Sequence, residues 1–141
     1  MNNSGIPTIL LVEDNRADIE LLKESLSFLK LEVNLYVITN GWMVRDFLRG
    51  NGIYAGIKKP DLIILDINLP GKNGFEILEE LRKDNPQQDL PVVILTSSRQ
   101  EEDIILALKL HANAVMFKPS DFHEFISLIK SIADEFLKSA K

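Results

Sequence analysis

The stretch that decides the fold is residues 60–74, PDLIILDINLPGKNG, in which an apolar run ends on a carboxylate. Four apolar residues in a row precede Asp66, a pattern typical of a strand buried on both faces of a parallel sheet. Pro70, Gly71 and Gly74 then turn the chain. Burying a carboxylate is costly, so an acid in this place needs a chemical reason.

The same strand pattern recurs along the chain and alternates with amphipathic, helix-like segments. This alternation is typical of a parallel sheet with helices on both faces. We therefore predict five βα units in one α/β domain spanning residues 1–141, with a core of about 8–137. Residues 49–60 form a long connection, and the ends 1–5 and 138–141 are expected to fray. The predicted strands are 8–13, 32–38, 61–66, 91–96 and 114–118, and the predicted helices are 16–29, 42–48, 75–82, 101–110 and 122–137.

Composition and charge exclude several classes of function. The 141 residues, 45% hydrophobic and 26% charged, suit one ordinary globular domain. Cysteine is absent, which excludes disulfides and thiolate metal sites, and the two histidines, His111 and His123, are expected at the surface. The net charge of −5 argues against nucleic acid as a direct partner, because such binding depends on clustered lysine and arginine.

The sequence also carries no recognisable targeting segment. No apolar run approaches the roughly 18 residues of a membrane span. The first residues lack the basic start and the cleavage site of a signal peptide. We therefore expect a cytoplasmic protein that makes no membrane contact.

Polar side chains stand at the ends of the predicted strands. The first strand ends on Glu13 and Asp14, the third on Asp66, the fourth on Thr96 and the fifth on Lys118. Ligands of an open parallel sheet bind beyond these carboxyl ends. Taken singly, each residue has a structural interpretation: Asp14 could cap the next helix, and Lys118 could be an ordinary solvated lysine. Taken together, they bring three carboxylates to one edge of the sheet.

Three carboxylates repel one another, so such a cluster persists only if a cation compensates the charge or one acid holds a proton. Oxygen ligands without histidine or cysteine suit Mg²⁺, which keeps waters that a phosphate can replace. A carboxylate can itself attack a phosphoryl group and form an aspartyl phosphate. We predict Asp66 as the acceptor, because it lies on the central strand, with Lys118 as a point charge and Thr96 as a hydroxyl donor.

In these motifs the sequence resembles the receiver domains of two-component response regulators, over residues 8–137. The resemblance implies a flavodoxin-like fold with the strand order 2-1-3-4-5. It also implies a protein that accepts a phosphoryl group from a sensor histidine kinase and is no enzyme beyond assisting its own phosphorylation and dephosphorylation. The proposed acceptor, threonine and lysine stand thirty and twenty-two residues apart, as in that family. The motifs are VEDN (12–15), LDINLPGKNG (65–74), LTSS (95–98) and FKP (117–119).

The family resemblance implies a particular set of metal ligands. Asp14 and Asp66 would bind Mg²⁺ directly, together with the backbone carbonyl of Asn68. Glu13 would act through a water molecule.

The resemblance also implies how the phosphoryl group is held and sensed. Lys118 would pair with it, the Lys118–Pro119 peptide bond would be cis, and Thr96 would swing to donate a hydrogen bond. Three positions before the lysine the family usually has Tyr, Phe or His, whereas this chain has Val115. Phe117 is expected to fill core space rather than to replace that ring.

Within the family, the long connection and the runs around Asp66 and Thr96 resemble the small receivers that partner phytochrome-type histidine kinases. Only 23 residues follow Lys118, so output is expected from the surface of this domain, or through a histidine phosphotransfer protein.

The fourth predicted helix suggests where that surface lies. In it, Ile104, Ala107 and Leu108 share one stripe, and Leu106 lies nearly opposite. With Val115 and the last helix, Leu106 is expected to line a homodimer or partner surface.

Two other classes of function fit the pattern less well. An aspartate-nucleophile phosphatase of the haloacid-dehalogenase type needs a second acid two positions after the first, where this chain has Asn68. That family also carries its nucleophile after the first strand. A binding module with an inactive site would not be expected to keep Glu13, Asp14, Asp66, Thr96 and Lys118 together.

Overall fold

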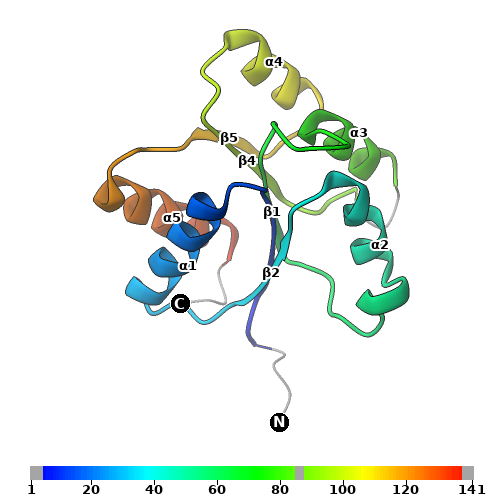
Figure 1. Ribbon diagram of the computed structural model, residues 1–141, viewed down its shortest axis with the longest axis horizontal. Helices are drawn as coiled ribbons and strands as arrows, with labels where there is room; N and C mark the ends of the chain where they lie inside the picture. Colours follow the sequence, from blue (N-terminus) through cyan, green and yellow to red (C-terminus); the bar gives the residue numbers. More distant parts are fainter. Residues whose placement is uncertain (1–4, 85–87, 138–141) are drawn as a thin grey trace.

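The structure is a computed structural model that describes residues 5–84 and 88–137. Five parallel strands form one sheet in the order β2-β1-β3-β4-β5, which confirms the predicted α/β flavodoxin-like fold (Figure 1). Fraying is expected at residues 1–5 and 138–141, and all of these except Gly5 lie outside the described ranges. The strands are β1 (Thr8–Val12), β2 (Asn34–Ile38), β3 (Leu62–Leu65), β4 (Val92–Thr96) and β5 (Ala114–Phe117).

The helices cover both faces of the sheet, as predicted. Figure 1 shows α1 and α5 on one side of the strands and α2, α3 and α4 on the other. Most element bounds differ from the prediction by one or two residues, because helix and strand ends have no sharp signal. The long connection after α2 contains a short 3₁₀ turn, η2 (Gly52–Tyr54), and another, η1 (Gly41–Met43), precedes α2. The helices are α1 (Arg16–Phe28), α2 (Val44–Arg49), α3 (Gly74–Lys83), α4 (Glu101–Lys109) and α5 (Phe122–Phe136).

The central strands are buried on both faces, which explains their unbroken apolar runs. Successive residues of a strand point to opposite faces. In β1, Ile9 and Leu11 pack with α1 and α5, whereas Leu10 and Val12 pack with α2 and α3. All residues of β1, β3 and β4 are buried. The carboxyl ends of these strands are therefore held rigidly by the core.

Side-chain caps start three of the helices close to the sheet edge. Asn15 accepts the backbone N–H of Asp18 at the start of α1, and Asp121 does the same for Glu124 at the start of α5. Asn73 and Glu76 form a reciprocal capping box at the start of α3. Because Asn15 caps α1, the interpretation of Asp14 as the cap is wrong.

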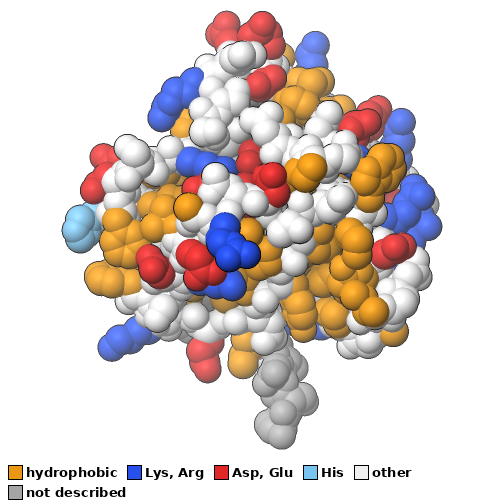
Figure 2. Space-filling model, in the orientation of Figure 1, with side chains coloured by type: hydrophobic (Ala, Val, Ile, Leu, Met, Phe, Trp, Pro, Cys, Tyr) orange, Lys and Arg blue, Asp and Glu red, His pale blue; other side chains and the backbone are white. Residues whose placement is uncertain are grey.

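Exposed apolar side chains gather on α4. Ala107 is fully buried, whereas Leu108, which shares its stripe on the helical wheel, is 50% exposed. Ala107 is the one buried residue of this nine-residue helix. Ile105 and Leu106 are also exposed, and apolar side chains show at the surface over α4 at the top of Figure 2. His111 and His123 lie at the surface, as predicted.

The loop that joins β3 to α3 packs against the start of the η1 turn. Trp42 is 63% exposed, and the ammonium of Lys72 lies 4.9 Å from the centre of its ring. Gly71 has a φ of 75°, and a Cβ there would come within 2.5 Å of the Trp42 ring. This position therefore demands glycine for both conformation and space. None of the helices in the described part of the chain is long and apolar enough to cross a membrane.

Candidate functional site

The carboxyl ends of β1 and β3 bring the predicted acids together. Val12 and Leu65 are paired in the sheet, and the N–H of Asp66 donates to the Val12 carbonyl at 3.0 Å. Glu13 continues the other edge of β1, where its N–H donates to the Ile38 carbonyl at 3.0 Å. The two acids that follow these paired strands therefore lie next to each other.

Three carboxylates form a compact cluster at this edge. One oxygen from each of Glu13, Asp14 and Asp66 lies within 4.8 Å of the others. Glu13 and Asp66 are buried, whereas Asp14 is exposed. The N–H of Asn68 donates to Asp66 Oδ1 at 3.3 Å, which fixes the start of the following loop. The cluster offers only oxygen ligands, the donor type that hard divalent cations prefer.

Lys118 lies at the centre of the acidic site. Its Nζ lies 2.8 Å from Glu13 Oε1, 2.8 Å from Asp18 Oδ2 and 3.2 Å from Asp66 Oδ2. The backbone N–H of Lys118 donates to the Thr96 carbonyl at 2.9 Å, which places the residue directly after β5. Only 10% of the side chain is exposed. All three ammonium protons therefore face carboxylates.

Burial and charge act in opposite directions at this ion cluster. The pKa of Glu13 is raised to about 7, because burial and the nearby charge of Asp66 raise it by more than the hydrogen bond from Lys118 lowers it. Burial lowers the pKa of Lys118, but its hydrogen bonds to Asp18 and Glu13 outweigh this effect and the net pKa is raised. The lysine therefore stays charged, while Glu13 holds a proton part of the time near neutral pH. Both ways of relieving clustered carboxylates are thus represented here, a cation in Lys118 and a partly held proton on Glu13.

Thr96 is buried at the end of β4 and is turned toward the next loop. Its Oγ1 accepts the N–H of Ser98 at 3.1 Å, and Ser98 Oγ is hydrogen-bonded to Asp103 of α4 at 2.7 Å. The threonine thus connects the sheet edge to the start of α4. A rotation of its side chain would release the Ser98 amide.

Two expectations about the end of β5 are wrong. The Lys118–Pro119 peptide bond is trans, since the described residues contain no cis bond; trans is the favoured form even before proline. Phe117 is only half-buried, and the guanidinium of Arg99 lies 4.6 Å from the centre of its ring. The ring is therefore covered by the loop after Thr96, rather than filling the core.

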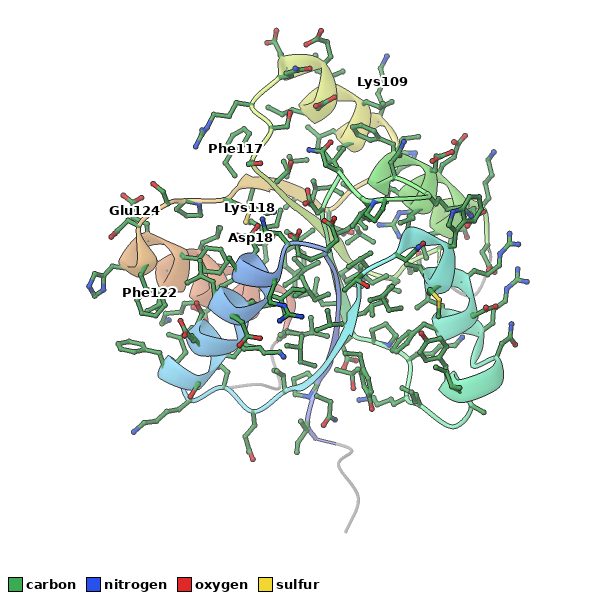
Figure 3. All side chains as sticks on the ribbon, viewed as in Figure 1. Asp18, Lys109, Phe117, Lys118, Phe122 and Glu124 are labelled. Carbon is green, nitrogen blue, oxygen red and sulfur yellow. The ribbon has the colours of Figure 1, made fainter. Side chains whose placement is uncertain are left out.

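Sequence reasoning missed Asp18, the third acid that Lys118 contacts. Asp18 lies in the first turn of α1 and is separated from Lys118 by 100 positions in the chain. Figure 3 shows its side chain beside Lys118. The available signal was its place in the first turn of the helix that follows Asp14, but that place alone does not show which strand end the side chain meets.

An open hollow adjoins the acidic site. It lies where the loops after β1, β2 and β3 meet, and its floor includes one of the clustered acids. A reacting group could therefore approach the cluster from solvent on this side. The lining residues are Asp14, Arg16, Ile19, Glu20, Thr39, Asn40 and Pro70.

Comparison with known protein families identifies the family to which this fold and this acidic site belong. The response regulator receiver domain family matches residues 9–130, with all of the strand-end residues inside the match. The chain belongs to this family. A receiver domain is the phospho-accepting partner of a histidine kinase, so the chain is a phospho-accepting response regulator domain. The phosphatase alternative finds no support.

Within this family, the chain is similar to two response regulators, Rcp1 and RcpA. The receiver is 34% identical over 131 residues to the response regulator Rcp1 of Synechocystis sp. (strain ATCC 27184 / PCC 6803 / Kazusa), covering 93% of this chain and 89% of that protein. It superposes with a TM-score of 0.88 on the phosphorylated cyanobacterial phytochrome response regulator RcpA, at 36% identity, covering 96% of this chain and 97% of the other. The Mn²⁺-bound form of Rcp1 gives a TM-score of 0.85 at 33% identity, with the same coverage.

Proposed function

We propose that Asp66 is the residue of this receiver that accepts the phosphoryl group. The observation that carries the assignment is its position. Asp66 is the buried acid at the end of the central strand β3, between the acids that follow β1 and the ammonium that follows β5. A carboxylate held by the core in this way is an oriented nucleophile.

In the proposed reaction, a carboxylate oxygen of Asp66 attacks the phosphorus of a phosphohistidine. A phosphorus–oxygen bond forms, the phosphorus–nitrogen bond breaks, and the imidazole leaves with that electron pair. Lys118 then exchanges its 3.2 Å contact with Asp66 for a phosphoryl oxygen, and Thr96 rotates away from Ser98 to donate its hydroxyl hydrogen. We expect catalysis by this chain to be limited to its own phosphorylation and dephosphorylation.

A divalent cation, which we propose to be Mg²⁺, fits the acid cluster. Asp14 and Asp66 would bind it directly with the backbone carbonyl of Asn68, and Glu13 would bind through water. The fit rests on three clustered carboxylates without a nitrogen or sulfur ligand among them. When bound, the cation would neutralise charge on the phosphoryl oxygens.

The partner that we propose as donor is a sensor histidine kinase of the phytochrome type, because RcpA, a phytochrome response regulator, and the response regulator Rcp1 are among the relatives that match nearly the whole chain. A histidine phosphotransfer protein is the other partner with suitable chemistry. The donor imidazole would approach through the hollow beside Asp14 and Pro70. We place this exchange in the cytoplasm, within one receiver domain spanning residues 1–141.

For output, we propose a homodimer through α4, β5 and α5. The support is the exposed apolar face of α4, where Ile105, Leu106 and Leu108 are each 40% exposed or more. Val115 of β5 lies half-buried nearby in the fold. Movement of the loop after Thr96 would change this surface, because Ser98 is hydrogen-bonded to Asp103 of α4.

The test is labelling with acetyl phosphate in the presence of Mg²⁺, followed by mass spectrometry. We expect one base-labile phosphoryl group at Asp66, absent from Asp66→Asn. Asp46→Asn, which changes an exposed aspartate of α2, is the matched control and should label normally. Undiminished labelling of Asp66→Asn would refute the assignment.

A further inference from the structure

Asp18 contacts the reactive lysine of the proposed site without belonging to the acid cluster. Its Oδ2 accepts from Lys118 Nζ at 2.8 Å, a distance as short as that from Glu13 to the same nitrogen. The metal-compatible cluster consists of Glu13, Asp14 and Asp66, so Asp18 is outside it. None of the steps of the proposed reaction requires Asp18.

The other two acids that hold Lys118 change partners during the reaction. Asp66 becomes an acyl phosphate, and its contact with the lysine is already the longest of the three, at 3.2 Å. Glu13 takes part in the metal cluster and accepts the N–H of Asn15 at 3.2 Å through its other oxygen. Among the residues that the structure describes, Asp18 is therefore the one carboxylate in contact with Lys118 that neither reacts nor faces the cation.

Asp18 is also held rigidly enough to act as a fixed point. Its backbone N–H donates to Asn15 Oδ1 at 3.0 Å, and the next residue, Ile19, is buried against the sheet. Figure 3 shows Asp18 at the start of α1, beside Lys118. A lysine side chain has a flexible four-carbon stem, so the place of its ammonium depends on what holds it.

We propose that Asp18 is a positioning residue, which holds the ammonium of Lys118 in place while the lysine exchanges Asp66 for the phosphoryl group. This inference rests on the proposed function. Without Asp18, the ammonium would keep its charge but lose the contact that fixes its direction. Phosphoryl transfer should then slow, while the affinity for the cation should not change, because Asp18 is not among the proposed ligands.

The matched control is Glu124, which occupies the same position in α5 as Asp18 does in α1. Both acids lie in the first helical turn, and both donate their backbone N–H to the capping side chain three residues earlier. Figure 3 shows Glu124 at the outer end of α5, away from Lys118. Asp18→Ala and Glu124→Ala therefore both remove a favourable acid from the start of a helix. Only Asp18→Ala also removes the contact with Lys118.

The experiment compares Asp18→Ala, Asp18→Asn and Glu124→Ala in the full chain. We expect Asp18→Ala to lower the initial rate of Asp66 labelling by acetyl phosphate about 10- to 100-fold, the usual range for a supporting residue. Asp18→Asn keeps an oxygen acceptor and should recover part of the rate. Glu124→Ala should label at the original rate, and none of the three should change the dissociation constant for Mg²⁺.

A second measurement needs no phosphorylation. Ammonium protons held in buried hydrogen bonds exchange slowly with water, so the ¹⁵N signal of Lys118 Nζ should be visible in the unchanged chain and in Glu124→Ala but lost in Asp18→Ala. An unchanged labelling rate or a faster one in Asp18→Ala would overturn the proposal, as would a weaker Mg²⁺ affinity. If the unchanged chain does not label at Asp66 but the ammonium signal behaves as expected, the proposed acceptor is wrong and the role of Asp18 in holding Lys118 stands.

Discussion

Gly74, the first residue of α3, lies directly against the backbone of Asp66. A Cβ on Gly74 would come within 2.5 Å of the Asp66 carbonyl oxygen and 2.8 Å of the Ile67 Cα. Backbone atoms of a buried strand end cannot move aside easily. The glycine therefore lets the helix start close behind the proposed acceptor.

Gly74→Ala should lower the free energy of unfolding by about 1–3 kcal/mol, the usual cost of overpacking a buried contact. The shift that makes room for the methyl group should also displace Asp66 and slow its labelling. Gly5→Ala is the control, because a Cβ there meets nothing within 4 Å. Urea unfolding and labelling rates would measure both effects, and equal behaviour of the two variants would contradict the steric argument.

The ligand assignment predicts an order of metal affinities. Glu13→Gln removes a contact made through water and should weaken Mg²⁺ binding about 10- to 100-fold. Asp14→Ala removes a direct ligand and should weaken it more. Glu20→Ala, which removes a neighbouring carboxylate outside the cluster, should change little. Calorimetric titration showing Glu13→Gln as the weaker binder would mean that the cation is misplaced.

The raised pKa of Glu13 predicts an unusual dependence of stability on pH. Between its ordinary value of 4.5 and about 7, the folded chain holds a proton that the unfolded chain has lost. The free energy of unfolding should therefore fall as the pH rises through this window in the absence of metal. Mg²⁺ displaces the proton, so its affinity should increase as the pH rises through about 7. Urea unfolding with a chelator and metal titrations would test both trends, which Glu13→Gln should abolish.

The proposed output surface predicts the effect of a charge on α4. Leu106→Glu should abolish self-association of the phosphorylated protein and spare labelling of Asp66, because it leaves the acid site untouched. Ile53→Glu is the control, since Ile53 is 83% exposed on η2 and lies outside α4, β5 and α5. Analytical ultracentrifugation would compare the variants. An identical mass for the phosphorylated protein with and without Leu106→Glu would place the output surface elsewhere.

The strand-end residues could be predicted because a parallel sheet leaves little choice. Once Glu13, Asp66 and Lys118 are assigned to strand ends, the topology alone brings them to one edge. The contacts among them required no knowledge of helix orientation. The same reasoning could not find Asp18, because its distance from Lys118 depends on how α1 packs on the sheet beside α5.

Residues in and beside loops were the hardest to predict. The place of Phe117 depends on Arg99, a loop residue whose direction no periodic pattern encodes. The exposure of Leu108 depends on how little of α4 the sheet covers, which is a property of helix tilt rather than of sequence spacing. Both residues lie at the boundary between core and surface, where a helical wheel or strand alternation carries little information.

Trp42, in η1, gives the molecule an optical property that follows from its contact with the loop between β3 and α3. It is the one tryptophan of the chain, so all indole emission comes from this position. Its ring contacts Gly71, five residues after Asp66, and lies under the ammonium of Lys72. Indole emission responds to nearby charge and to contact with solvent. The fluorescence of Trp42 therefore reports on the loop beside the acid site without any attached dye.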